Sequence, residues 1–201
     1  MIIIKREANL TRNSKETQIE ISLNLDGTGE YDIHTGSGFL DHMLELFARH
    51  GRFDLSIKCV GDTHIDYHHT TEDIAMVLGD AFQTALGDRK GICRYGEISI
   101  PMDEAMVMAV VDLSGRSYVV NNLQIPTEKV GNFDTELINE FMVAFSRKSK
   151  SNIHFYQFAG TNSHHIIEAA FKALARSLRK AVSIDEEFKD EIPSTKGILD
   201  I

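Results

Sequence analysis

The stretch that decides the fold is Asp66–Gly87, DYHHTTEDIAMVLGDAFQTALG. It contains the motif His68-His69-x-x-Glu72, and apolar residues then recur at helical spacing from Ile74 to Leu86. This spacing is typical of one face of an amphipathic helix. The stretch therefore predicts a long helix that carries its histidines in the first turn.

The motif occurs a second time, in Asn162–Val182, NSHHIIEAAFKALARSLRKAV, as His164-His165-x-x-Glu168. Apolar residues again follow at helical spacing, from Ile167 to Val182. One such motif can arise by chance. Two motifs, each at the start of a helix, indicate a duplicated domain that carries metal ligands.

Helix geometry limits how these side chains can bind a metal. Neighbouring residues on a helix point roughly 100° apart, whereas residues three or four positions apart share a face. His68 and Glu72 can therefore converge, and so can His69 and Glu72. The two adjacent histidines cannot easily bind one ion within one helix, so the motif suggests two metals or a metal shared between elements.

The composition sets limits on the class of protein. The chain has 201 residues, of which 42% are apolar and 25% charged, a profile typical of a globular protein with a normal core. Its net charge is -9 and its pI about 5.4, which disfavours nucleic acid as a partner. A few local Arg and Lys side chains can still form a pocket for an anionic small molecule.

Other features concern the cellular compartment. Cys59 and Cys93 are too few for a disulfide framework and are compatible with a reducing cytoplasm. The N-terminal stretch MIIIKREANL is too short and too soon charged to be a signal peptide. No stretch approaches the roughly 18 apolar residues of a membrane span. We therefore expect a cytoplasmic protein without a membrane partner.

The first half of the chain predicts the element order βββαβα. Asp26-Gly27 is a hairpin signal, after which the chain can return as a third strand. Gly51 is expected to end the first helix. The predicted elements are strands Ile2–Ala8, Gln18–Leu25 and Gly29–His34, helix Phe39–His50, strand Asp54–Val60, and the first motif helix, which ends near Gly87.

The second half repeats this order. Ile125–Asn132 is expected to be a loop because it contains Pro126 and Gly131. The predicted elements are strands Gly96–Pro101, Ala105–Asp112 and Ser117–Asn122, helix Thr135–Ser149, strand Asn152–Phe158 and helix Ser163–Ser183. We thus expect an α+β fold with half-domains at residues 1–92 and 93–184, followed by a polar tail at residues 185–201.

Superimposing one half on the other tests the duplication. Phe47 falls on Phe145, and His42 falls on Glu140. Both His42 and Glu140 lie on the shorter helix of their half. The comparison yields two sets of potential metal ligands: His42, His68, His69 and Glu72, and Glu140, His164, His165 and Glu168.

These nitrogen and oxygen ligands suit Mn, Fe, Co or Zn. The alternative is that polar helix starts carry His and Glu for capping and solvation, and two matched copies weigh against it. The remaining histidines have no repeat partner, so a structural role or one supporting the ligands is expected for them. They are His34, His50, His64 and His154.

Scattered basic residues are candidates for an anion pocket. Lys172 lies one helical turn beyond Glu168 and is expected to face the same region. Ser194 and Lys196 in the tail offer the hydroxyl and ammonium donors that phosphate takes. With Arg94 and Arg116, they form the candidate set. The candidates for acid–base chemistry are the carboxylates Glu16, Asp103 and Glu104, each of which can also be an ordinary loop residue.

Five segments resemble the imidazoleglycerol-phosphate dehydratase family of histidine biosynthesis, and the resemblance covers nearly the whole chain. The segments are LDHMLELFARHGRFDL, GDTHIDYHHTTEDIAMVLGDAF, IPMDEA, DLSGRSY and AGTNSHHIIEAAFKALARSLRKA. The resemblance implies a duplicated βββαβα fold in which each half places two helices on one face of a four-stranded sheet. It also implies a hollow particle of 24 subunits, with sites for two Mn²⁺ ions formed between subunits.

The resemblance also implies roles for individual residues. The metal ligands would be His42, His68, His69, Glu72, His164, His165 and Glu168, with Glu140 at a position where some relatives have histidine. The substrate contacts would be Glu16, the run His42–His50, His68, Glu72, Arg94, Arg116, His164, Glu168, Lys172, Ser194 and Lys196. Glu16 is the preferred acid–base residue because it is not a ligand, and Glu72 or Glu168 could double in that role.

The implied reaction is the loss of water from imidazole glycerol phosphate to give imidazole acetol phosphate. The carbon that loses the proton has no adjacent carbonyl, so the imidazole ring would have to accept electron density instead. Two alternatives remain open at this point. Paired His/Glu sites also activate water in di-metal hydrolases, and a particle with metal sites could serve storage or act as a scaffold.

Overall fold

The computed structural model describes residues 5–199. The first half forms a sheet with the strand order β1-β2-β4-β3, and β3 pairs in parallel with β4. Its elements are β1 (Glu7–Asn13), β2 (Thr17–Asn24), β3 (Tyr31–His34), α1 (Gly38–Gly51), β4 (Asp54–Gly61) and α2 (His68–Leu86).

The second half repeats this arrangement in the order β5-β6-β10-β7, and β7 pairs in parallel with β10. Its elements are β5 (Tyr95–Met102), β6 (Ala105–Asp112), β7 (Tyr118–Asn122), β8 (Lys129–Val130), β9 (Phe133–Asp134), α3 (Leu137–Ser149), β10 (Asn152–Ala159) and α4 (Ser163–Val182). The predicted duplicated α+β fold is confirmed. The proposed limits of the half-domains stay a prediction.

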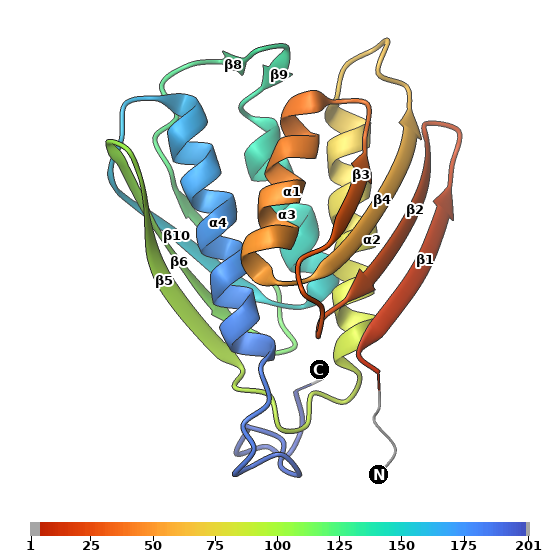
Figure 1. Ribbon diagram of the computed structural model, residues 1–201, viewed down its shortest axis with the longest axis vertical. Helices are drawn as coiled ribbons and strands as arrows, with labels where there is room; N and C mark the ends of the chain where they lie inside the picture. The colour runs from red at the N-terminus through yellow and green to blue at the C-terminus, as the bar shows by residue number, and fades with distance from the viewer. Residues whose placement is uncertain (1–4, 200–201) are drawn as a thin grey trace.

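The four helices lie between the two sheets (Figure 1). The two helices of each half cover the inner face of that half's sheet. The halves meet where α1 packs beside α4 and α2 beside α3. Aromatic rings fill the centre, with 6.3 Å between the centroids of Phe47 and Phe145, the pair aligned by the duplication. Helices α2 and α3 approach so closely that a Cβ at Gly79 would lie 2.6 Å from the Cβ of Lys148.

Two predicted details of the first half are wrong. The first strand is Glu7–Asn13 rather than Ile2–Ala8, because pairing with β2 extends it to the turn before Thr17; residues 2–4 lie outside the described residues. The segment after Asp26-Gly27 does not form a hairpin with β2. Instead β4 lies between β2 and β3, and α1 makes the crossover that a parallel pair requires.

The other differences are smaller. Helix α1 includes Gly51 as its last residue, and the left-handed residue that caps it, φ 58°, is Arg52 rather than the glycine. Gly51 is instead needed for packing, because a Cβ there would lie 2.4 Å from the ring of Phe53. The predicted loop Ile125–Asn132 contains β8, which pairs with β9.

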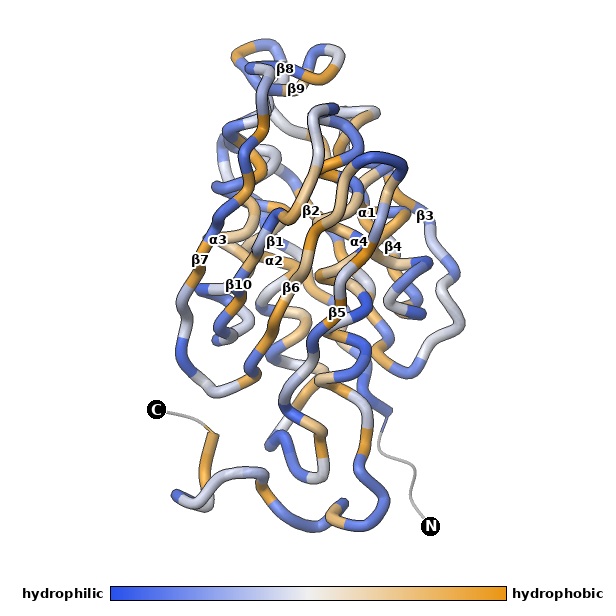
Figure 2. Tube along the Cα trace, turned by 90° about the vertical axis from the view of Figure 1, so that its left-hand side faces the viewer, coloured by the Kyte–Doolittle hydropathy of each residue, from blue (hydrophilic) through white to orange (hydrophobic). Residues whose placement is uncertain are grey.

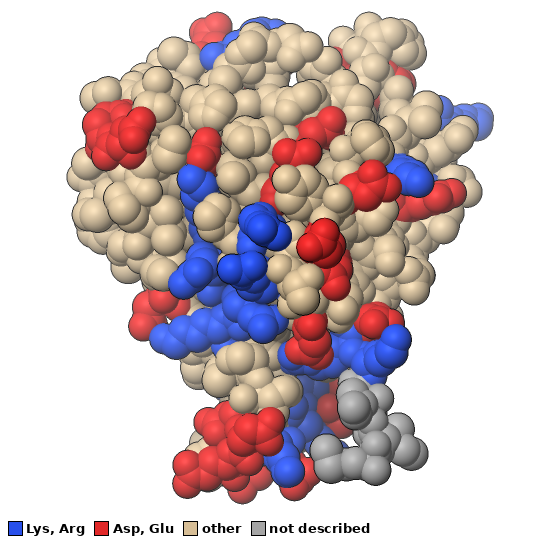
Figure 3. Space-filling view, in the orientation of Figure 1, with Lys and Arg blue, Asp and Glu red and all other residues tan. Residues whose placement is uncertain are grey.

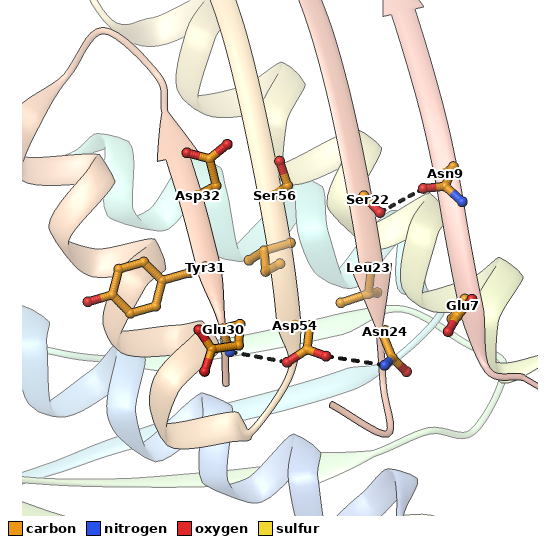
Figure 4. A pocket seen from close by; sticks show the side chains of 11 residues that line it. Glu7, Asn9, Ser22, Leu23, Asn24, Glu30, Tyr31, Asp32, Asp54 and Ser56 are labelled. Carbon is orange, nitrogen blue, oxygen red and sulfur yellow. Dashed lines mark hydrogen bonds between the residues drawn. The ribbon is translucent and has the colours of Figure 1, made fainter. Parts of the chain in front are cut away.

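The outer faces of the two sheets differ in chemistry. Polar side chains cover the first, around a shallow hollow of about 450 Å³ that is lined by Glu7, Asn24 and Asp54, among others (Figure 4). Asp54 accepts hydrogen bonds from the backbone N–H groups of Thr28, Gly29 and Glu30. It thereby holds the loop between β2 and β3.

The strands of the second sheet, coloured by hydropathy in Figure 2, carry exposed apolar side chains on their outer face. Because side chains alternate along a strand, the exposed Met106 and the half-buried Met108 of β6 lie on the same outer face. Tyr156 of β10 pairs with Met108, and Phe158 of the same strand is 56% exposed. Within residues 5–199, no helix combines the length and apolar composition that a membrane span requires.

The tail after α4 folds back onto the segment that links the two halves. The backbone N–H of Asp185 donates to the carbonyl of Gly91, and the N–H of Gly91 donates to the carbonyl of Glu191. A side-chain hydrogen bond of 2.8 Å joins Arg94 to the carbonyl of Pro193. The tail therefore forms an ordered loop beyond the C-terminal end of α4 (Figure 1).

Candidate functional site

Three potential metal ligands meet between α1 and α4. His42 of α1 and His164 and Glu168 of α4 place ligand atoms within 4.8 Å of one another. The Nε2 atoms of His42 and His164 lie 3.6 and 3.2 Å from the same oxygen, Oε2 of Glu168. The alignment of the two halves predicts that His42 joins the ligands of its own half. The packing of α1 on α4 instead places His42 with the ligands of the second half.

The local sequence explains the position of the second motif. Asn162 caps α4, since its side chain accepts hydrogen bonds from the backbone N–H groups of His164 and His165. His164 and Glu168 are four residues apart and so share one helix face. The cap thus fixes the first turn, which carries His164, and Glu168 lies one turn further along the same face.

Glu168 is the most constrained member of this cluster. It is buried, and its second oxygen, Oε1, lies 2.5 Å from Nζ of Lys172. Burial acts to raise the pKa of Glu168, but the hydrogen bond and charge of Lys172 outweigh it, so that the pKa lies below its usual value. Glu168 is therefore held as a carboxylate that faces two imidazoles.

This donor set fits a divalent metal ion. Two imidazole nitrogens and one carboxylate oxygen suit Mn, Fe, Co or Zn. Three ligands also leave coordination positions open for substrate, water or side chains of another subunit. Within residues 5–199 this is the one group of three or more potential ligands that converges so closely.

The second histidine of this motif points elsewhere. His165 Nδ1 lies 2.7 Å from Oε2 of Glu104, in the β5–β6 turn. The other oxygen of Glu104 accepts hydrogen bonds from the N–H groups of Thr161 and Asn162. The hydrogen bond from His165 contributes most to lowering the pKa of Glu104 to about 2, and the two backbone bonds lower it further. The contact with Glu104 in turn raises the pKa of His165.

Glu104 therefore orients His165, with Nδ1–H donating to the carboxylate and Nε2 left as the possible metal-binding atom. The sequence alone suggests Glu104 only as a candidate for acid–base chemistry. The other carboxylate of that turn, Asp103, is largely exposed and lies 3.7 Å from His165 Nε2.

The first motif has the same construction. His69 Nδ1 lies 2.9 Å from Oδ2 of Asp62, and this hydrogen bond raises the pKa of His69. His68 Nε2 lies 3.9 Å from Glu72, which also pairs with Arg147 of α3 at 3.3 Å. Sequence reasoning missed Asp62, although a carboxylate shortly before a histidine doublet was an available signal.

The ligands predicted for the first motif do not close into a second cluster. Glu140 lies in the first turn of α3, half-buried, and makes no hydrogen bond or ion pair with any described residue. His68, His69 and Glu72 likewise form no group of three within the part of the chain that the structure describes. A metal held there would need further ligands from outside this chain or from solvent.

Glu16 lies in the turn between β1 and β2. Its carbonyl accepts a 3.0 Å hydrogen bond from the N–H of Asp62. Its carboxylate is exposed, and its charge contributes to the raised pKa of His69. Glu16 therefore lies close to the first motif without being fixed to any of its side chains.

The basic residues predicted for an anion pocket do come together. Arg94, Arg116, Ser194 and Lys196 line a cavity of about 440 Å³, which we call the phosphate cradle. Sequence reasoning missed Asp112, which lies 2.7 Å from Arg94 Nε and raises the pKa of that guanidinium.

Lys172 and His50 lie apart from this cradle. Lys172 pairs with Glu168, and His50 lies close enough to Lys172 to feel its charge. Burial lowers the pKa of His50, and the positive charges of Lys172 and Arg176 lower it further. The predicted anion contacts thus fall into two groups.

The phosphate cradle and the metal-ligand cluster, formed by His42, His164 and Glu168, lie at opposite ends of α4. The N–H of Arg94 donates to the carbonyl of Ala181, close to the end of the helix, whereas His164 is in its first turn. At 1.5 Å per residue, His164 and Ala181 are about 25 Å apart along the helix axis. One small substrate cannot reach from the metal-ligand cluster of a chain to the phosphate cradle of the same chain.

Comparison with known proteins gives a consistent result. Residues 35–178 match the family model described as imidazoleglycerol-phosphate dehydratase. Two relatives of that name, from Cereibacter sphaeroides (strain ATCC 17029 / ATH 2.4.9) and Ruegeria pomeroyi, are each 54% identical over 194 residues. The match covers 96% of this chain and 100% of either relative.

Solved structures of the same enzyme also match. That of imidazoleglycerol-phosphate dehydratase from Staphylococcus aureus superimposes with a TM-score of 0.81 at 41% identity, covering 89% of this chain and 99% of the other. That from Pyrococcus furiosus, solved in complex with (S)-C348, also gives a TM-score of 0.81, at 35% identity. It covers 94% of this chain and 100% of the other.

Proposed function

The chain belongs to the imidazoleglycerol-phosphate dehydratase family, and we propose that it dehydrates imidazole glycerol phosphate to imidazole acetol phosphate with bound Mn²⁺. The observation that supports this most directly is the convergence of His42, His164 and Glu168. A storage protein or scaffold would need neither an acid–base candidate beside the first motif nor a phosphate cradle. The family match argues against a di-metal hydrolase.

The metal would be held by the ligand sets of both motifs, two ions per active site. The sets are His42, His164 and Glu168, and His68, His69, Glu72, Glu140 and His165. When bound, Mn²⁺ would supply Lewis-acid stabilisation and orient the imidazole ring. Asp62 and Glu104 would hold His69 and His165 in position.

The protein's own residues account for the remaining requirements. The carbon that bears the ring loses its hydroxyl group, the neighbouring carbon loses a proton, and the resulting enol tautomerises to the ketone. Glu16 is our candidate for moving the proton, because its carboxylate is exposed beside the first motif and is free of ion pairs within residues 5–199. The phosphate cradle would fix the far end of the substrate.

Self-association follows from the distance between the metal-ligand cluster and the phosphate cradle. With bond lengths near 1.5 Å, the substrate is no more than about 10 Å long, well short of the roughly 25 Å between metal-ligand cluster and cradle. A complete site therefore needs the cradle of one subunit next to the metal ligands of another. We propose that the subunits assemble into a 24-subunit particle in the cytoplasm.

The function is tested by incubating the purified protein with imidazole glycerol phosphate and following the ketone product. Removal of metal with a chelator is expected to abolish turnover, and added Mn²⁺ to restore it. Product formation that survives complete metal removal would refute the role of the metal. Failure to form the ketone in the presence of Mn²⁺ would refute the reaction.

We predict that Lys196→Ala mainly raises KM. Loss of one charge-assisted hydrogen bond to phosphate costs about 1.5–3 kcal/mol, or roughly 10- to 150-fold in substrate binding. Steady-state kinetics with substrate concentration varied will separate KM from kcat, and a fall in kcat alone would exclude a phosphate role for Lys196. Lys172→Ala is a poorer probe, because Lys172 also holds Glu168.

The apolar outer face of the second sheet is a candidate subunit interface. We predict that Met108→Asp, in the middle of that face, prevents formation of the large particle, since a buried unpaired charge is costly. The matched control is Ser22→Asp, on the polar outer face of the first sheet. Light scattering should give a reduced mass for the first variant and the parent mass for the control; equal masses would contradict the prediction.

A further inference from the structure

Basic side chains continue along α4 beyond the metal-ligand cluster. His164, Glu168, Lys172, Arg176 and Lys180 follow one another at intervals of four residues, so each is a neighbour of the next on the surface of α4, while the row turns gradually around the helix. Figure 3 shows Lys and Arg side chains gathered in a stripe over this part of the molecule. Arg176 is exposed and makes no hydrogen bond or ion pair with any residue in the described range 5–199.

The C-terminal end of α1 adds to this stripe. Burial lowers the pKa of His50, and the nearby charges of Lys172, Arg176 and Arg52 lower it further, against the opposing charge of Glu168. Arg52 donates to the carbonyl of Thr28, and Arg179 donates to that of Leu25. The carboxylates nearby are Glu168, which pairs with Lys172, and Asp26, which pairs with Arg6 and also lies near Arg179. The four cations Arg52, Lys172, Arg176 and Arg179, which we call the basic patch, outnumber them.

The opposite charge is concentrated in the tail. The acidic segment, Asp185–Glu191 (DEEFKDE), has five carboxylates and one lysine. None of these carboxylates forms an ion pair within the described part of the chain. Figure 3 shows the red cluster of this segment below the basic stripe. Phe188 in its middle is 50% exposed, as expected for a segment that docks on another surface.

The acidic segment is attached to the phosphate cradle. Glu191 bonds through its carbonyl to Gly91, and two residues later the carbonyl of Pro193 accepts from Arg94, a cradle residue. Segment and cradle therefore move as one body. Any subunit that brings its cradle to a neighbour's metal-ligand cluster also brings its acidic segment to the neighbour's α4.

We propose that the acidic segment of one copy docks on the basic patch of a second copy, and so delivers the phosphate cradle to the metal-ligand cluster. This proposal rests on the proposed function, because the shared substrate site is what requires the approach. The basic patch begins at Lys172, next to the cluster, and Arg176 lies one turn further. The roughly 25 Å between cradle and cluster prevents the chain's own cradle from reaching its own cluster, so the acidic segment that docks comes from a second copy.

Charge reversal tests the contact. Arg176→Glu, and separately the double change Glu186→Arg and Glu187→Arg, should each weaken assembly. We expect the subunit concentration at half-assembly to rise at least about tenfold, as for loss of a charge pair worth 1.4 kcal/mol or more. The three changes combined exchange the signs of the two surfaces, shift the net charge only from -9 to about -7, and should restore assembly. Arg176→Glu places a carboxylate one turn from Lys172, so the helix itself should stay folded.

The matched control is Lys180→Glu, one turn beyond Arg176 on the same helix, whose lysine already pairs with Glu97 at the surface. Light scattering over a dilution series at several salt concentrations gives the mass, and circular dichroism checks folding. Parent-like assembly of Arg176→Glu, or no recovery in the combined variant, would overturn the proposal. Because mass is measured without substrate, failure of the dehydratase reaction would leave this result intact and is recognised separately.

Discussion

Replacing Glu168 with glutamine is expected to lower metal content and dehydratase turnover together, turnover by on the order of 10³-fold or more. One oxygen of Glu168 faces His42 and His164, and the other holds Lys172. A neutral amide would weaken the metal site and leave Lys172 without its partner. Loss of Lewis-acid stabilisation of several kcal/mol corresponds to a fall of this size.

The measurement is metal per subunit by mass spectrometry, together with steady-state turnover in added Mn²⁺. Glu20→Gln is the matched control, because Glu20 lies on the exposed outer face of the first sheet. Circular dichroism would separate loss of metal from loss of fold. Full metal content with normal turnover in Glu168→Gln would show that Glu168 is not a ligand.

The second large effect is expected for Glu16→Gln, which should keep its metal and lose turnover by about 10²- to 10⁴-fold, the usual contribution of a positioned acid or base. The Glu16 carboxylate is exposed beside His69 and belongs to no ion pair within residues 5–199. Its removal should therefore leave the ligand sets intact. It should remove only the group that moves the proton.

The duplicated fold supplies a contrasting variant for this test. Glu104 precedes β6 as Glu16 precedes β2, but Glu104 is bonded to His165. Glu104→Gln should therefore weaken metal binding first and turnover as a consequence. If Glu16→Gln turned over substrate at the parent rate, Glu16 would have no part in the mechanism, and if it lost metal, Glu16 would belong with the ligands instead.

Local spacing in the chain was enough to predict the main elements. The two motif helices, the alternation of β2 and the repeat of one half on the other all depend on periods of 3.6 or 2 residues, and such periods are visible without a structure. The hairpin at Asp26-Gly27 failed for the opposite reason. A turn signal does not say which strand the chain pairs with next, and β4 took that place beside β2.

The sequence by itself determined the duplicated fold, the donor types of the two motifs and the basic residues of the cradle. Only the tertiary structure decided that His42 joins His164 and Glu168, that Asp62 and Glu104 hold the second histidines, and that cradle and cluster lie at opposite ends of α4. These contacts join elements that are distant in the chain, and they arise when two sheets enclose four helices. Packing of this kind leaves no periodic pattern in the sequence, because it depends on which helix faces lie side by side.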